Sequence, residues 1–229
     1  MSIGHNLKHI EQLIRQAESR YGRLPGSVKL IAVSKTFPVE DAMECYQCGQ
    51  RLFGENKVQE ALSKIPVLPS DAQWHLIGPL QRNKVRKIIG KAAMIHTVDS
   101  LKLAEYMDSV ARELSIVQDV LLEVHVGGEE SKFGFHPDEL ETSWPALCNL
   151  EHLNIRGLMC IPPPVDNVED ARPYFRQLRE LKERLNASGS RQIQELSMGM
   201  SHDFEAAIAE GATFVRVGTA IFGARDYSH

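Results

Sequence analysis

Cysteine is scarce in the sequence, and long apolar runs are missing. The chain of 229 residues has four cysteines, too few for the disulfide framework that stabilises small secreted domains. No uninterrupted apolar run reaches the roughly 18 residues of a membrane-spanning helix. The formal net charge is −4, and without a basic excess a nucleic-acid-binding face is disfavoured. Residues 1–7 lack the basic and apolar regions of a signal peptide, so we expect a cytoplasmic protein.

Motifs for metal or redox chemistry are also sparse. Cys45 and Cys48 form the only C-x-x-C pair, and they fall inside a helical pattern at about 39–48, which favours an ordinary helix. The histidines do not have the spacing of metal ligands. His75 lies in an apolar segment, which favours a hydrogen-bonded core histidine. The basic run at 82–87 has no interleaved aromatic residues, so we expect a solvated helix face there.

Strand-like apolar segments alternate with helical patterns along most of the chain. We expect strands at about 30–33, 51–54, 74–77, 94–98, 120–126, 155–159, 195–198 and 214–217. Helices are expected at about 39–48, 56–65, 81–89, 101–114, 137–150, 168–185 and 204–210. Eight strands alternating with helices are typical of a (β/α)8 barrel. We therefore predict an α/β fold with a single TIM-type barrel.

An additional helix precedes the first strand. Ile3, Leu7, Ile10 and Ile14 recur at helical spacing and predict a helix over about 3–21, either capping the bottom of the barrel or lying against its side. The barrel itself is expected over about 29–227, which makes residues 1–229 one domain. An open doubly wound sheet is disfavoured because no G-x-G-x-x-G follows the first strand.

A lysine follows the first predicted strand, at the end of the barrel where TIM-barrel active sites lie. Lys35 comes directly after Ala32, Val33 and Ser34. Apolar neighbours favour partial desolvation, which lowers the pKa of an amine and frees it to attack an aldehyde. Lys35 is therefore a candidate for a Schiff base.

Small residues and hydroxyls follow the last two predicted strands. Gly199 and Ser201 precede one helix, and Gly218 and Thr219 open a short terminal helix. Backbone N–H groups, hydroxyls and helix N-termini together attract phosphate. A lysine nucleophile beside a phosphate site suits a phosphorylated aldehyde, and pyridoxal 5'-phosphate is the commonest such cofactor. A Schiff-base aldolase without a cofactor has the same requirements, so both interpretations stay open here.

Five motifs carry a resemblance to a known family. The chain resembles the pyridoxal phosphate homeostasis proteins, which are single-domain relatives of the alanine racemase barrel. The matching strings are AVSKT at 32–36, FGENKVQE at 53–60, WHLIGPLQ at 74–81, GLMCIP at 157–162, and LSMGMS at 196–201 with VRVGTAIFG at 215–223. They occur in order over about 30–227, nearly the whole chain.

The resemblance implies a set of cofactor-binding residues. Lys35 is implied as the covalent lysine, Arg216 as the arginine facing the pyridine nitrogen, and Asn56 as a neighbour of the ring. No catalytic residue and no metal site are expected. The phosphate contacts are implied for Ser201, Gly218 and Thr219.

Two residues depart from the family pattern. His202 stands where an aspartate is common, and Phe133 stands where a small residue is usual. Neither is expected to touch the Schiff base or the phosphate site, so both concern only the rim of the pocket.

The resemblance implies a function in vitamin B6 homeostasis with little or no catalytic turnover. We expect a cytoplasmic monomer that exchanges pyridoxal phosphate with acceptor apoenzymes. The alternative is a pyridoxal phosphate-dependent amino-acid racemase. It is disfavoured because two-base racemases of this lineage take a tyrosine from a second domain, for which the chain leaves no room, and only one base, Lys35, is evident.

Overall fold

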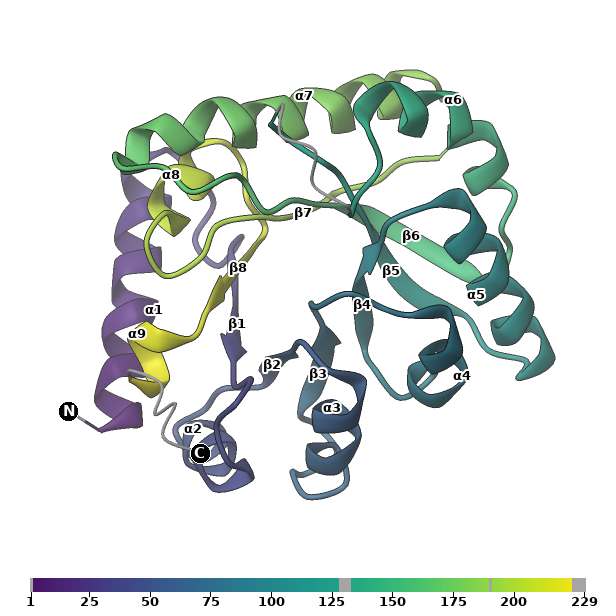
Figure 1. The fold of residues 1–229 in the computed structure, drawn as a ribbon. Helices are drawn as coiled ribbons and strands as arrows, with labels where there is room; N and C mark the ends of the chain where they lie inside the picture. Colours follow the sequence, from purple (N-terminus) through teal and green to yellow (C-terminus); the bar gives the residue numbers. More distant parts are fainter. Residues whose placement is uncertain (1, 128–132, 190, 224–229) are drawn as a thin grey trace.

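The computed structural model describes residues 2–127, 133–189 and 191–223. Its centre is a closed barrel of parallel strands, in which consecutive strands are neighbours and β8 pairs with β1 (Figure 1). The predicted TIM-type fold is therefore confirmed. The strands are β1 (Lys29–Val33), β2 (Leu52–Glu55), β3 (Gln73–Leu76), β4 (Met94–Val98), β5 (Gln118–Glu123), β6 (Leu153–Met159), β7 (Glu195–Ser197) and β8 (Phe214–Val217).

Helices surround the barrel and follow the strands in alternation (Figure 1). The predicted helix at 81–89 is divided into a 3-10 turn and one α-helical turn, and the one predicted from 168 begins with a 3-10 turn. The helices are α1 (Ile3–Arg20), α2 (Val39–Gln47), α3 (Val58–Lys64), η1 (Arg82–Lys84), α4 (Val85–Ile88), α5 (Leu101–Glu113), α6 (Pro137–Cys148), η2 (Val168–Ala171), α7 (Arg172–Ala187), α8 (Phe204–Ala209) and α9 (Thr219–Phe222).

The end of β5 differs from the sequence prediction. The strand was expected to reach residue 126, but it ends at Glu123. The backbone N–H of His125 donates to the carbonyl of Phe135 at 2.9 Å, and Phe135 donates back to Glu123 at 2.8 Å. The residues after Glu123 therefore pair with the segment that leads into α6, while Val124 still donates to Met159 of β6 at 2.8 Å.

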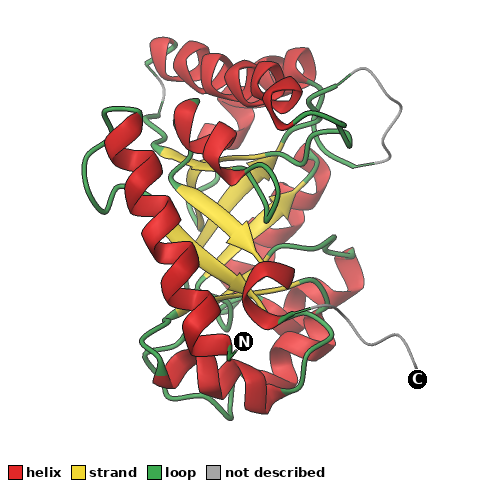
Figure 2. Ribbon diagram, turned by 90° about the vertical axis from the view of Figure 1, so that its left-hand side faces the viewer, coloured by secondary structure: helices red, strands yellow, loops and turns green. Residues whose placement is uncertain are grey.

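The helix α1 lies against the side of the barrel. Its N-cap is Ser2, whose hydroxyl accepts from the backbone of His5. The helix packs against α8, α9 and α2, and the side chain of Asn6 donates to the carbonyl of Ile221 at 2.9 Å. Figure 2 shows it running alongside the strands. Because α9 has four residues, α1 covers the strands where a longer last helix would otherwise pack.

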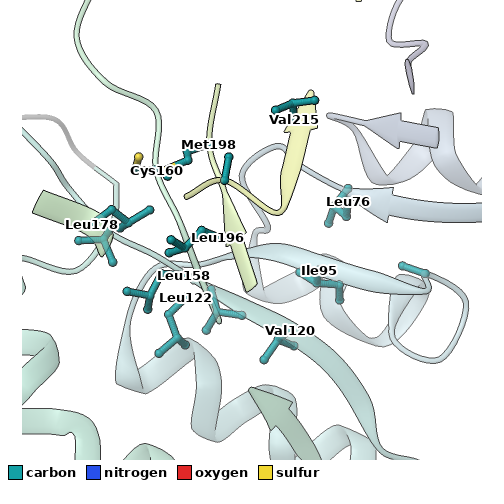
Figure 3. Packing of buried hydrophobic residues seen from close by; sticks show 14 of the residues in the cluster. Leu76, Ile95, Val120, Leu122, Leu158, Cys160, Leu178, Leu196, Met198 and Val215 are labelled. Carbon is teal, nitrogen blue, oxygen red and sulfur yellow. The ribbon is translucent and has the colours of Figure 1, made fainter. Parts of the chain in front are cut away.

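Apolar side chains fill two regions, one on each side of the sheet. The larger lies between the strands and the helices, where alternate strand residues such as Leu122, Leu158 and Leu196 meet Leu178 of α7 (Figure 3). The smaller lies inside the barrel and contains Ile31, Val33, Ile77, Met94, Leu121, Met159 and Phe214. Within the described residues, no helix is long and apolar enough to cross a membrane.

Candidate functional site

A pocket of about 210 Å³ lies where several strands end at their carboxyl termini. All six site residues that the sequence analysis predicted contribute to its lining. Because they come from strands distributed around the barrel, closure of the sheet is what brings them together. The lining consists of Val33, Lys35, Asn56, Ile77, Ile161, Met200, Ser201, His202, Arg216, Gly218 and Thr219.

The lysine is held in a tight turn after β1. Thr36 has φ +69°, in the left-handed region that costs a non-glycine residue about 1–2 kcal/mol. Its backbone N–H donates to the carboxylate of Glu60 at 3.1 Å. One residue later, the ring of Phe37 stacks on Phe222 at 5.2 Å between centroids. The turn is therefore fastened to α3 on one side and to α9 on the other.

A buried ion pair lies directly behind this turn. The ammonium of Lys64 donates to Glu55 Oε1 at 2.6 Å and to the carbonyl of Ser34 at 2.8 Å. The hydroxyl of Ser34 donates to the same carboxylate oxygen at 2.7 Å. Burial raises the pKa of Glu55, while the bonds from Lys64 and Ser34 oppose that shift. The residues flanking Lys35 and Asn56 are thus joined to each other through buried polar contacts.

Three residues that follow the neighbouring strands β7 and β8 form what we call the cradle: Ser201, Gly218 and Thr219. The hydroxyl of Ser201 accepts from the backbone N–H of Gly218 at 3.4 Å and from the hydroxyl of Thr219 at 3.5 Å. Both distances are at the long limit for hydrogen bonds. The three donors therefore converge while engaging one another only weakly.

The cradle depends on a glycine at the end of β7. Gly199 has φ +89°, and a Cβ there would lie 2.6 Å from the Cβ of Ala207. The helix α8 begins at Phe204, where it was predicted, so Ser201 lies in the segment that precedes it. The carboxylate of Asp203 accepts from the backbone N–H of Met200 at 2.6 Å and holds this segment as a turn. The helix dipole therefore contributes less to the cradle than expected.

Arg216 reaches the pocket from inside the barrel. Its side chain is buried, with Nη1 donating to Ser197 Oγ at 2.6 Å and Nη2 donating to the carbonyl of Cys160 at 2.9 Å. A guanidinium has no acceptor and stays protonated. The pocket therefore has a fixed cation in its lining, held from the β6 and β7 strands.

The two departures from the family pattern fall in different places. His202 is exposed and belongs to the pocket lining beside Ser201, and the expectation that it does not touch the cradle stays a prediction. Phe133 is half-exposed and is not part of the lining. The residues just before it, 128–132, lie outside the described residues.

Sequence reasoning missed the apolar wall of the pocket. Val33, Ile77, Ile161 and Met200 line it, and each of them stands next to or inside a motif that was recognised for its polar residues. The sequence feature that could have identified these four residues is their position at or just after the ends of strands. An apolar wall with a few convergent polar groups is the usual composition of a small-molecule site.

The donor set of the pocket suits an anionic aldehyde. It offers an amine, a guanidinium, hydroxyls, an amide and a backbone N–H, and none of the described residues that line it carries a carboxylate. An amine can bond to a carbonyl carbon, and the cradle can donate to phosphate oxygens. No group of three His, Cys, Asp or Glu side chains that could hold a metal ion occurs in the part of the chain that the structure describes.

The sequence matches a known protein family and has full-length relatives. Residues 5–226 match the model of the alanine racemase N-terminal domain. The pyridoxal phosphate homeostasis protein of Aquifex aeolicus is 46% identical over 99% of this chain and 100% of that protein. The Escherichia coli K12 protein of the same name is 43% identical over 99% and 98%.

Solved structures of two proteins share the fold of this chain. PipY of Synechococcus elongatus with PLP bound has a TM-score of 0.82 and 42% identity, covering 92% of this chain and 100% of that chain. Alanine racemase from Bartonella henselae shares the fold, with a TM-score of 0.73 and 16% identity, but the match covers 62% of that longer chain. The chain therefore belongs to the alanine racemase N-terminal domain family and, within it, to the pyridoxal phosphate homeostasis proteins.

Proposed function

We propose that this protein holds pyridoxal 5'-phosphate as a Schiff base on Lys35 and acts in intracellular vitamin B6 homeostasis, with little or no catalytic turnover. The observation that carries this proposal is the pocket that contains Lys35, Arg216 and the cradle together. Support comes from PipY, a relative whose structure contains bound PLP, and from the names of the curated relatives.

Each side chain has a distinct role in the proposal. The neutral amine of Lys35 attacks the aldehyde carbon of the cofactor, and loss of one water leaves a C=N bond to Nζ. The phosphate oxygens accept hydrogen bonds from the cradle. Asn56 would lie beside the ring, and Arg216 would face the pyridine nitrogen. Because a guanidinium only donates, it disfavours protonation of that nitrogen, which weakens the ring as an electron sink.

The rim of the pocket favours exchange of the cofactor over sequestration. Ile161 is 50% exposed and Met200 is 39% exposed, although both line the pocket. A site that opens to water at its apolar edge excludes solvent poorly, which disfavours catalysis and allows release. We propose that acceptor apoenzymes receive the cofactor from this one-domain, monomeric, cytoplasmic protein.

The racemase alternative depends on a second acid or base. In the described lining, His202 is the titratable side chain that accompanies Lys35, so the sequence expectation of a single base in the pocket was incomplete. His202 is exposed, and a solvated imidazole is not held on one face of a substrate. The geometry therefore favours storage and transfer over racemisation.

The direct test is spectroscopic. Protein reconstituted with pyridoxal phosphate should show the visible band of a Schiff base, and borohydride should fix the pyridoxyl group on the peptide that contains Lys35. Lys35→Ala should lose the band and keep the fold, because the side chain is at the mouth of the barrel. Lys57→Ala is the matched control: Lys57 is an exposed lysine nearby whose side chain pairs with Glu60, and its loss should leave the band unchanged. A band that persists in Lys35→Ala would contradict the assignment.

A further inference from the structure

A chain of hydrogen bonds runs through the barrel interior to the pocket. Arg216 Nη1 lies 2.6 Å from Ser197 Oγ, which lies 2.9 Å from Nδ1 of His96. Nε2 of His96 lies 2.8 Å from Nδ1 of His75. The four side chains come from four strands, and all of them are buried. Arg216 is the member that lines the pocket.

Arg216 sets the direction of this chain. Because a guanidinium can only donate, Ser197 Oγ must accept from it. The serine then has one hydrogen to donate, and the nitrogen facing it is Nδ1 of His96. Accepting there puts the hydrogen of His96 on Nε2, from which it donates to Nδ1 of His75. His75 is then protonated on Nε2.

The opposite direction leaves more buried groups unsatisfied. If His96 donated to Ser197, the serine would accept from both neighbours, and its own hydrogen would have no acceptor among the bonds described for it. His75 Nε2, which has no partner in the described structure, would be a bare acceptor. In the favoured direction the single unmatched group is the Nε2 hydrogen of His75. An unmatched buried polar group costs about 1–3 kcal/mol. The direction that leaves one such group is therefore more stable than the direction that leaves two.

Electrostatics favour the same direction. Burial lowers the pKa of His75 to about 3 and that of His96 well below its usual value, so both rings are neutral near pH 7. Each acceptor in the favoured chain points its negative end toward the cation of Arg216. Bonds aligned in this way polarise and strengthen one another.

We propose that Ser197 and His96 are positioning residues that orient the guanidinium of Arg216 in the pocket through a one-way hydrogen-bond chain ending at His75. Neither residue lines the pocket, so neither is expected to touch a ligand. The chain fixes where the Arg216 donors point, because Nη1 and Nη2 are held by Ser197 and Cys160. This inference rests on the proposed function for its consequence, which is the affinity for pyridoxal phosphate.

The first experiment determines the direction of the hydrogen-bond chain, in protein without cofactor. Long-range ¹H–¹⁵N spectra of histidine-labelled protein near pH 7 should show His75 and His96 as neutral rings protonated on Nε2. Resonances are assigned from His75→Phe and His96→Phe. A ring protonated on Nδ1 at either position would overturn the direction, and a charged ring would overturn the chain itself.

The second experiment measures the effect on the pocket. Ser197→Ala removes the acceptor of Arg216 Nη1 and should weaken binding of pyridoxal phosphate by roughly tenfold or more. Ser197→Thr keeps a hydroxyl and should restore most of the affinity. His96→Phe should weaken binding too, and the double variant Ser197→Ala/His96→Phe should be no worse than the stronger single effect, because both act through Arg216.

A control separates positioning from loss of stability. Gln118 is another buried polar residue, bonded to Gly90 and Ala92 at the opposite end of the strands, and Gln118→Leu should lower stability while leaving affinity unchanged. If wild-type protein does not bind pyridoxal phosphate, the proposed function fails. The histidine tautomers would still test the direction of the hydrogen-bond chain. If it binds and Ser197→Ala binds equally well, the positioning role is wrong.

Discussion

The ammonium of Lys64 and the carboxylate of Glu55 are 2.6 Å apart, and their side chains are 6% and 0% exposed. The pair joins α3 to the end of β2, immediately behind the turn that carries Lys35. Such a pair contributes little more to the stability of the fold than apolar residues of the same shape. Removal of one partner is nevertheless costly, because the other charge then stays buried without an opposite charge. Its effect on stability can therefore be measured by removing one partner or both.

Lys64→Met should destabilise the protein by about 3–5 kcal/mol, and adding Glu55→Gln should recover much of that loss. Denaturant unfolding near pH 7 measures both. The exposed pair of Arg86 and Glu113 has the same separation of 2.6 Å, and Arg86→Met should cost far less stability than Lys64→Met. Equal losses for Lys64→Met and Arg86→Met would refute the argument that burial sets the cost.

Removal of the cradle hydroxyls should weaken cofactor binding. Charge-assisted hydrogen bonds contribute about 1.5–3 kcal/mol each, so the double variant Ser201→Ala/Thr219→Ala should lose roughly 10²-fold or more in affinity. The two single effects should not add, because both hydroxyls bind one phosphate. Retention of the cofactor through dialysis and gel filtration measures the loss. The matched control is Thr142→Ala, an exposed hydroxyl of α6, and cradle variants that retain the cofactor like this control would contradict the placement.

Glu123 should make the stability of the cofactor-free protein depend on pH. Burial, with the carboxylate of Asp99, raises its pKa to about 7 against the opposing charge of Arg216. In the unfolded chain the pKa of a glutamate is about 4.3, so the folded state binds the proton more tightly. Stability from this group is present at low pH and is lost as pH rises from about 4.3 to about 7.

Glu123→Gln should therefore raise the free energy of unfolding at pH 8 by up to about 3 kcal/mol and change it little at pH 4. Denaturant unfolding at the two pH values tests this. Glu113→Gln, at an exposed site, should show no comparable difference between them. A gain that is the same at both pH values would show that Glu123 does not titrate in the expected range.

Turnover of amino acids by the loaded protein should be negligible. Racemisation needs an acid and a base on opposite faces of the substrate, and each typically contributes 10²- to 10⁴-fold. The exposed imidazole of His202 is the candidate partner of Lys35 in the lining. Alanine racemase assays should detect no rate that His202→Ala abolishes. A rate above about 1 s⁻¹ that is lost in His202→Ala would favour the racemase.

Much of the barrel was predictable because its signals are local. Apolar strands followed by amphipathic helices set the alternation, and the six residues predicted for the site lie in or after strands, within the motifs that suggested them. The prediction failed where the outcome depends on contacts from elsewhere. The backbone pairing of His125 with Phe135, for example, ends β5 earlier than its apolar sequence predicts.

The buried polar groups were the least predictable part of the site. His96 and Ser197 are 101 residues apart, and Ser34 meets Lys64 from a different element. Each of these residues looks unremarkable in its own segment. Their roles come from strand neighbours that are set only when the sheet closes, so local sequence patterns do not contain them.

Pairing of β1 with β8 also has a consequence for synthesis of the protein. The pocket straddles this seam, since Lys35 follows the first strand and Gly218 follows the last. During translation the lysine emerges almost two hundred residues before the cradle that completes its site. On the proposed function, a nascent chain would expose the Lys35 amine before the cradle that binds the phosphate exists, so cofactor capture would wait until the last strand has been synthesised. On the same proposal, pyridoxal phosphate could bind in full only after the whole barrel has folded.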